Sequence, residues 1–118
     1  MKLVASLLCH DERARSLEEC IGSLQEFCDE IRVVDDASTD GSFEWLGQQD
    51  RVHVVQFPAA RFFQHEGHAR EALLNWSLGA HGSHYLSVDC DELVDDGVAL
   101  RARVARSEER RVGKECRL

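Results

Sequence analysis

Short apolar runs alternate along this chain with longer segments in which apolar residues recur every three or four positions. Short continuous runs are typical of buried strands, and the longer spacing is typical of amphipathic helices. The runs predict strands over Lys2–Cys9, Ile31–Asp35, Val52–Phe57 and Ser83–Val88. The spacing predicts helices over Leu17–Phe27, Ser42–Gln48, His68–Ala80 and Val98–Arg106.

Strands and helices therefore alternate from the first element to the last. This order predicts an α/β fold with a mostly parallel sheet and helices on both faces. Ser16 and Glu19 have the spacing of a capping box at the start of the first helix. The segment Ala59–Gly67 mixes aromatic, histidine and arginine residues without a period, so we predict an irregular connection there.

Polar residues cluster where three of the four predicted strands end. The clusters are His10-Asp11-Glu12, Asp35-Asp36 with Ser38-Thr39-Asp40, and Asp89-Cys90-Asp91-Glu92. The carboxyl ends of parallel strands lie at one edge of a sheet, and ligands bind there in open α/β folds. Alternate carboxylates at such an edge suit a hard divalent cation and a phosphate-bearing ligand. We therefore expect one site at this edge, although a solvated acidic turn would explain any single cluster.

Composition fits one globular domain that contains no membrane span. The chain has 118 residues, is 43% hydrophobic and contains one proline. No apolar run approaches the roughly 20 residues that a membrane-spanning helix needs. The five cysteines form no CxxC pair, which favours reduced core residues over a disulfide framework or a zinc site. We expect a cytoplasmic protein with no transmembrane segment, and peripheral attachment to a membrane stays open.

The charge of the chain is distributed unevenly. The formal net charge is −8, and residues 1–100 hold 19 acidic against 7 basic side chains. Such an acidic body argues against a nucleic-acid partner, because binding to phosphate backbones needs clustered basic residues. Residues 107–118 have no apolar period and belong to a region, 101–118, in which basic residues outnumber acidic ones by 7 to 3. We expect residues 107–118 to be a non-native or disordered tail.

The glycine-rich phosphate loops GxGxxG and GxxxxGK[ST] are absent after the first strand, so a dinucleotide-binding fold or a P-loop is disfavoured. Two other stretches are informative. Residues 33–42, Val-Val-Asp-Asp-Ala-Ser-Thr-Asp-Gly-Ser, resemble the VVDDGSTDGT signature of the family 2 glycosyltransferases. Residues 86–92, Leu-Ser-Val-Asp-Cys-Asp-Glu, resemble the LxLDADE metal motif of that family, and the first strand with Asp11-Glu12 resembles its opening segment. The resemblance covers roughly residues 2–100.

The resemblance implies a Rossmann-like GT-A fold, truncated after its first half. Residues 1–106 would be the nucleotide-sugar-binding half of a domain that transfers a sugar, with inversion, from a UDP- or GDP-sugar to an acceptor hydroxyl. The acceptor would be a saccharide, a lipid or a protein, and the cofactor would be Mn²⁺ or Mg²⁺. The catalytic base would lie beyond Leu118, so this fragment alone is expected to be inactive.

The resemblance also implies roles for individual residues. Asp91 would ligate the metal, with Asp89 contacting the ribose or a metal-bound water, and Arg70 would help to hold the donor. In the other motif, Asp36 would contact the base, Asp35 would support the loop, and Leu8 and His10 would line the base pocket. This sequence departs from the family at Ala37, where glycine is usual, and at His10-Asp11, where Tyr-Asn is usual. Asn75 follows Arg70 by five residues, whereas the family has an adjacent Arg-Asn pair.

Three other interpretations remain open. Asp89-Cys90-Asp91-Glu92-Leu93-Val94 also resembles the DxDx[TV] motif of haloacid-dehalogenase-like phosphatases, in which Asp89 would be a nucleophile. A nucleotide-binding fragment without turnover is the non-enzymatic alternative. The pairs His65/His68 and His81/His84 have a spacing that zinc sites use, although surface or core histidines are the simpler explanation.

Overall fold

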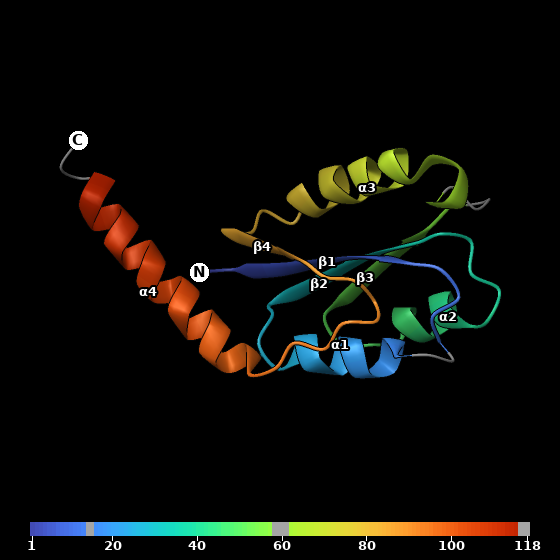
Figure 1. Ribbon diagram of the computed structural model, residues 1–118, viewed down its shortest axis with the longest axis horizontal. Helices are drawn as coiled ribbons and strands as arrows, with labels where there is room; N and C mark the ends of the chain where they lie inside the picture. Colours follow the sequence, from blue (N-terminus) through green and yellow to red (C-terminus); the bar gives the residue numbers. More distant parts are fainter. Residues whose placement is uncertain (14–15, 58–61, 116–118) are drawn as a thin grey trace.

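The computed structural model describes residues 1–13, 16–57 and 62–115, with the backbone alone for 62–66, 68 and 108–115. Within these ranges strands and helices alternate in the predicted order (Figure 1). The strands are β1 (Leu3–Cys9), β2 (Glu30–Asp35), β3 (Val52–Gln56) and β4 (His84–Ser87). The helices are α1 (Leu17–Gln25), α2 (Ser42–Gly47), α3 (Phe62–Leu78) and α4 (Gly97–Glu115).

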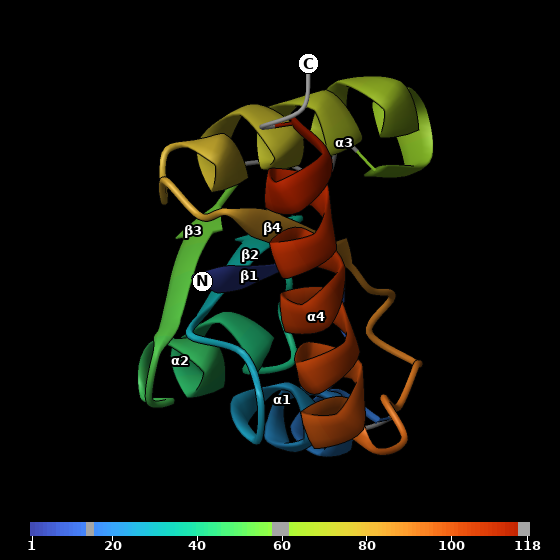
Figure 2. The same cartoon turned by 90° about the vertical axis from the view of Figure 1, so that its left-hand side faces the viewer.

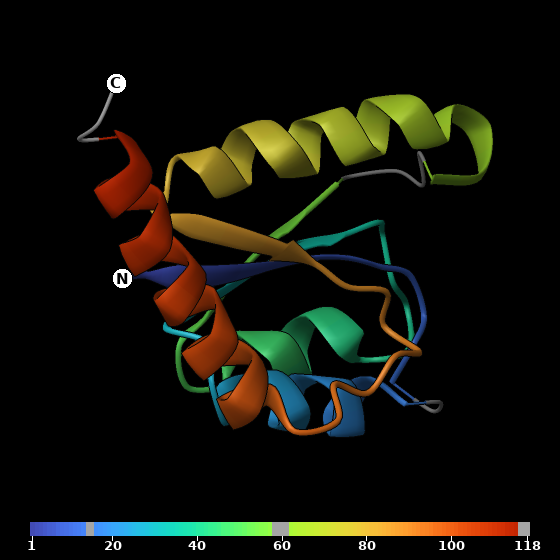
Figure 3. The same ribbon diagram turned by 60° about the vertical axis from the view of Figure 1, so that its left-hand side comes forward.

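The four strands form one parallel sheet in the order β3-β2-β1-β4. Helices α1 and α2 lie on one face of this sheet and α3 lies on the other (Figures 1 and 3). The predicted α/β fold with a parallel sheet and helices on both faces is therefore confirmed.

The core lies between α1 and the two central strands. Nearly every side chain of β1 is buried, and β2 buries Ile31, Val33 and Val34. Helix α1 adds Leu17, Cys20, Ile21 and Leu24, which share one face because they are three or four residues apart. Full burial of one such aliphatic side chain contributes about 1.5–3 kcal/mol. The continuous apolar runs of the sequence thus mark the two strands that are covered on both faces.

Strand β4 is an edge strand, which corrects the expectation of a buried strand over Ser83–Val88. Its exposure alternates: Tyr85 and Ser87 are exposed, whereas Leu86 packs against the core. The alternation arises because successive side chains of a strand point to opposite faces. One face of β4 therefore covers the core, and the other lies toward α3 at the margin of the sheet.

Helix α4 crosses the amino ends of the strands, as Figure 2 shows. The Arg101 guanidinium anchors it with hydrogen bonds of 2.8 Å to the Phe27 carbonyl and 2.8 Å to an Asp29 carboxylate oxygen. The helix continues to Glu115, so the expected end at Arg106 is wrong. Most of the predicted tail, 107–118, is thus helical, and residues 116–118 lie outside the described residues.

Two further local expectations are wrong. Helix α3 begins at Phe62, so most of the segment predicted to be irregular is helical, and residues 59–61 lie outside the described residues. Ser16 makes no side-chain capping bond; its hydroxyl donates instead to the Cys90 carbonyl at 3.2 Å. No helix in the described ranges is long and apolar enough to cross a membrane.

Candidate functional site

The polar loops after β1, β2 and β4 meet at one edge of the sheet. Strand β1 lies between β2 and β4, so the loop that follows it has the other two loops as neighbours. The strand order also reverses at β1, and in open parallel sheets ligands bind outside the carboxyl ends at such a reversal. The predicted convergence of the three acidic clusters on one rim is confirmed by this topology.

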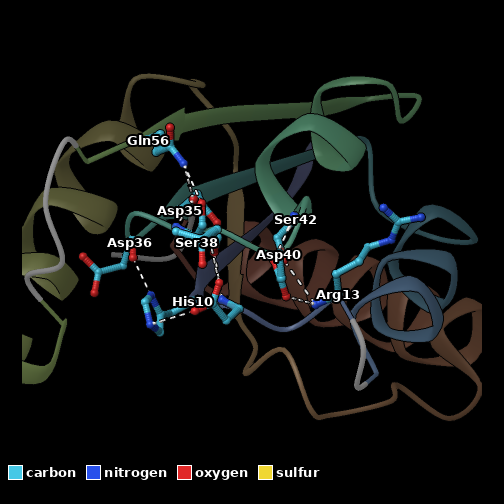
Figure 4. A network of polar contacts seen from close by, with 10 residues as sticks. His10, Arg13, Asp35, Asp36, Ser38, Asp40, Ser42 and Gln56 are labelled. Atoms are coloured by element: carbon cyan, nitrogen blue, oxygen red, sulfur yellow. Dashed lines mark hydrogen bonds and ion pairs between the residues drawn. The ribbon is translucent and has the colours of Figure 1, made fainter.

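The Asp35 carboxylate organises the loop after β2. It is fully buried and accepts hydrogen bonds from the Ser38 backbone N–H at 2.9 Å, the Ser38 hydroxyl at 2.6 Å and the Gln56 amide at 2.9 Å. Three donors satisfy most of the accepting capacity of a carboxylate. Asp35 is therefore committed to holding the loop in shape, in line with its predicted supporting role (Figure 4).

A tight backbone turn follows Asp35. Ala37 has a φ of 55°, in the left-handed region, and the Ser38 hydroxyl accepts a hydrogen bond of 2.8 Å from the Asp11 N–H. The Asp11 carboxylate accepts in turn from the Thr39 N–H at 2.8 Å. These reciprocal bonds join the loops after β1 and β2 into one unit.

Replacing Ala37 with glycine is expected to raise the free energy of unfolding by about 0.5–1 kcal/mol, because the left-handed region strains every residue that has a Cβ. Urea denaturation measures this change. The matched control is Ala102→Gly, at an exposed position inside α4. There we expect the opposite sign, a loss of about 1 kcal/mol, because glycine weakens a helix interior. Destabilisation by Ala37→Gly would contradict the strain at position 37.

His10 is held across the same turn. Its Nδ1 lies 2.5 Å from the Asp36 carbonyl oxygen and its Nε2 lies 3.3 Å from an Asp11 carboxylate oxygen. A carbonyl only accepts, so Nδ1 carries the hydrogen of this bond. Asp36 is fully buried, and Figure 4 shows its carboxylate pointing away from the Asp35–Ser38 network. Two of the three residues predicted at the base pocket, His10 and Asp36, thus lie side by side.

A second polar unit closes the loop at its far end. The Asp40 carboxylate accepts from the Ser42 N–H at 3.0 Å and from the Arg13 N–H at 3.0 Å. Burial raises the pKa of Asp40, but the hydrogen bonds from Ser42 and Arg13 outweigh burial and hold that pKa below its ordinary value. The Arg13 guanidinium lies 5.3 Å from the ring centroid of Trp45, so the loop after β1 also contacts α2.

The acidic turn after β4 is anchored by its backbone. The Cys90 thiol donates to the Leu8 carbonyl at 3.2 Å, and the Cys20 thiol lies 3.6 Å from the Asp89 carbonyl. The contact with Cys9 and burial raise the pKa of the Cys90 thiol, and burial raises that of Cys20 to about 11. Such thiols stay protonated and act as donors here. This anchoring positions the predicted base-pocket residue Leu8 beside the turn.

The side chains predicted to hold a metal lie on the outside of this turn. Asp89 and Asp91 are exposed, and the Glu92 carboxylate accepts from the Asp89 N–H at 2.9 Å. Two exposed carboxylates suit a cation that keeps most of its water and takes its other ligands from substrate phosphates. They do not suit an all-protein cage, and in the described ranges no three His, Cys, Asp or Glu side chains converge on a metal position.

The pair His81/His84 forms no zinc site with the other side chains that the structure describes. His81 is exposed, and the His84 Nδ1 lies 3.0 Å from the Ser83 hydroxyl. The side chains of His65 and His68 lie outside the described residues.

Arg70 lies on α3, across a cleft from β4. The cleft has a volume of about 350 Å³ and is lined by Ser6, Arg70, Leu73, Leu74, Tyr85 and Ser87. Arg70 is thus on the face of the sheet opposite α1, next to the strand that leads to Asp89.

The sequence did not reveal which residues connect the loops. Ser38 belongs to one of the predicted polar clusters, but its bonds to Asp35 and Asp11 depend on the three-dimensional turn. No sequence pattern pointed to Gln56, although it lies opposite Asp35 in the register between β2 and β3 and donates to its carboxylate. Cys90 was expected to be a small core residue and is buried, but its link to Leu8 joins residues 82 positions apart.

Comparisons with known proteins show relatives without an assigned role. No family model matches the sequence. An uncharacterized protein from Mycobacterium tuberculosis and one from Mycobacterium bovis are each 31% identical to the chain over 121 residues. The match covers 98% of this chain, which spans about 30% of the length of these curated relatives. The functional argument therefore depends on the geometry of the rim.

Proposed function

We propose that this chain is the nucleotide-sugar-binding portion of a metal-dependent, inverting glycosyltransferase of family 2, with a Rossmann-like GT-A fold. One observation carries the proposal: the loops after β1, β2 and β4 form a single acidic rim at the reversal of the strand order. The two motifs that resemble this family occupy two of those three loops.

The proposed roles follow the geometry of the rim. Asp35 keeps the loop after β2 folded, and Asp36 and His10, which contact each other, would meet the base of the nucleotide. Asp91, with Asp89, would hold Mn²⁺ or Mg²⁺, which would neutralise charge on the departing diphosphate. Arg70 would contact the donor from the α3 side. The acceptor site and the catalytic base are proposed to come from polypeptide outside residues 1–118.

Replacing Asp91 with alanine is expected to weaken Mn²⁺-dependent binding of UDP or GDP by about tenfold or more, equivalent to about 1.4 kcal/mol. The reason is that an exposed carboxylate, together with the diphosphate, supplies the ligands of the cation. Isothermal titration calorimetry with and without Mn²⁺ measures the effect. The matched control is Asp95→Ala, which removes an exposed carboxylate from the loop before α4 and is expected to leave binding unchanged.

Two results would count against the proposal. One is a folded sample that binds neither nucleotide in the presence of Mn²⁺. The other is covalent trapping of Asp89 by a phosphate analogue, which a phosphatase nucleophile allows and a transferase of this kind does not.

A further inference from the structure

Helix α1 carries a row of polar side chains on the side that faces the segment between β4 and α4. The row consists of Ser16, at the N-cap of the helix, and of Cys20 and Ser23, one and two turns later. Residues four and seven positions apart share one side of a helix, so the three side chains follow one line along it. The segment from β4 to α4 runs beside that line (Figures 1 and 3). We call Ser16, Cys20 and Ser23 the α1 polar row.

Two members of the row hold backbone carbonyls of the acidic turn after β4. The Ser16 hydroxyl donates to the Cys90 carbonyl at 3.2 Å, and the Cys20 thiol donates to the Asp89 carbonyl at 3.6 Å. With the backbone held on this side, the Cys90 side chain is buried, and the carboxylates on either side of it, Asp89 and Asp91, are exposed. The outward direction of both carboxylates is thus tied to α1.

Ser23 holds the far end of the same turn. Its hydroxyl donates to the Cys20 carbonyl of its own helix at 2.7 Å and accepts from the Val94 N–H at 3.4 Å. A hydroxyl has one hydrogen and two lone pairs, so it makes both bonds at once. Between these anchors the turn closes on itself, because the Glu92 N–H donates to the Asp89 carbonyl at 2.9 Å and the Glu92 carboxylate accepts from the Asp89 N–H at 2.9 Å. The turn is therefore attached to α1 at both ends.

We propose that the α1 polar row positions the carboxylates of Asp89 and Asp91 for a divalent cation that is bound together with a nucleoside diphosphate. This inference rests on the proposed function of the rim. Two carboxylates on an unattached loop would lose conformational freedom when they bind a cation, and the bonds from α1 remove that freedom beforehand. The row acts through the backbone of this one turn, so its loss should weaken metal-dependent binding and leave the contacts with the base unchanged.

Removing two hydroxyls of the row, in the double variant Ser16→Ala/Ser23→Ala, tests the proposal. We expect Mn²⁺-dependent binding of UDP or GDP to weaken about tenfold, the lower end of the effect of groups that orient metal ligands. Binding of the corresponding nucleoside, which lacks the diphosphate, should not change. Isothermal titration calorimetry measures both ligands. Ser16→Thr/Ser23→Thr keeps both hydroxyls and should restore binding, and Ser107→Ala, at an exposed position of α4, is the matched control.

A second measurement needs neither nucleotide nor metal. In the alanine double variant we expect faster hydrogen exchange at the Asp89 and Glu92 N–H groups, because the turn opens more often without its anchors. The backbone N–H groups of β1 should exchange as they do in the unsubstituted chain, since the variant leaves the sheet intact.

The outcomes separate this proposal from the proposed function. If the unsubstituted chain and the alanine double variant bind the nucleotide with Mn²⁺ equally well, the row does not position the carboxylates, and the proposed function stands. Equal weakening of nucleotide and nucleoside binding would mean that the row only stabilises the fold. A folded, unsubstituted chain that binds no nucleotide with Mn²⁺ would overturn both. Unchanged exchange at Asp89 and Glu92 would overturn the positioning role whatever the chain binds.

Discussion

Replacing Asp35 with alanine is expected to lower the free energy of unfolding by about 3 kcal/mol, one of the two largest single-residue effects that we predict for this chain. The carboxylate is fully buried and accepts from two groups of Ser38 and from Gln56. Without it the two buried donors of Ser38 lose their partner, and each buried unsatisfied group costs about 1–3 kcal/mol, whereas the exposed Gln56 amide can bond to water. The variant no longer buries a carboxylate, which offsets part of this loss.

Urea denaturation measures the effect, with two variants for comparison. Asp35→Asn keeps one accepting oxygen, so we expect an intermediate loss of about 1–2 kcal/mol. Asp95→Ala removes an exposed carboxylate and should change stability by no more than about 0.5 kcal/mol. If Asp35→Ala is as stable as Asp95→Ala, the loop after β2 does not depend on this carboxylate.

Replacing Gly97 with alanine is expected to lower the free energy of unfolding by about 2 kcal/mol. A Cβ at this position would lie 2.0 Å from Cδ1 and 2.4 Å from Cε1 of Phe27. The Phe27 ring is buried against the core, so the whole ring or the start of α4 must move. Helix α4 would then also separate from the Arg101 contacts at the amino ends of the strands.

The same glycine-to-alanine change at Gly22 is the control. An added Cβ there meets nothing within 4 Å on the exposed side of α1, and alanine favours a helix by about 0.5–1 kcal/mol. Urea denaturation should therefore show opposite signs for the two variants, and limited proteolysis should cut α4 faster in Gly97→Ala. Equal stability of Gly97→Ala and the unsubstituted chain would mean that Phe27 does not pack beneath this residue.

The parts of the fold that were predicted correctly are those in which burial determines the sequence pattern. Strands β1 and β2 are covered on both faces, and their continuous apolar runs follow from that position. The first turn and a half of α3 was missed because Phe62–Gly67 is helical without an apolar stripe that the sequence reveals. The exposed edge of β4 was missed because a short run such as His84–Ser87 gives no information about how many neighbours a strand has.

The sequence was enough to predict which loops form the candidate site, but not which hydrogen bonds join them. Carboxyl ends of parallel strands meet, so the position of Asp35, Asp89 and Asp91 on one rim follows from the element order alone. The pairing of Asp35 with Gln56 requires the register between β2 and β3, which no local pattern encodes. The hydroxyl of Ser16 was misassigned for the same reason, because its partner Cys90 is brought beside it by the whole fold.

The central position of β1 has a consequence for biosynthesis. Among the four strands, β1 is synthesised first and β4, one of its two neighbours, is synthesised last, since Ser6 pairs with Ser87. Until then one side of the most apolar strand stays open, and contacts between such distant residues slow folding. Translation speed and chaperone supply over residues 10–87 should therefore govern the soluble yield of this chain more strongly than changes made in α4.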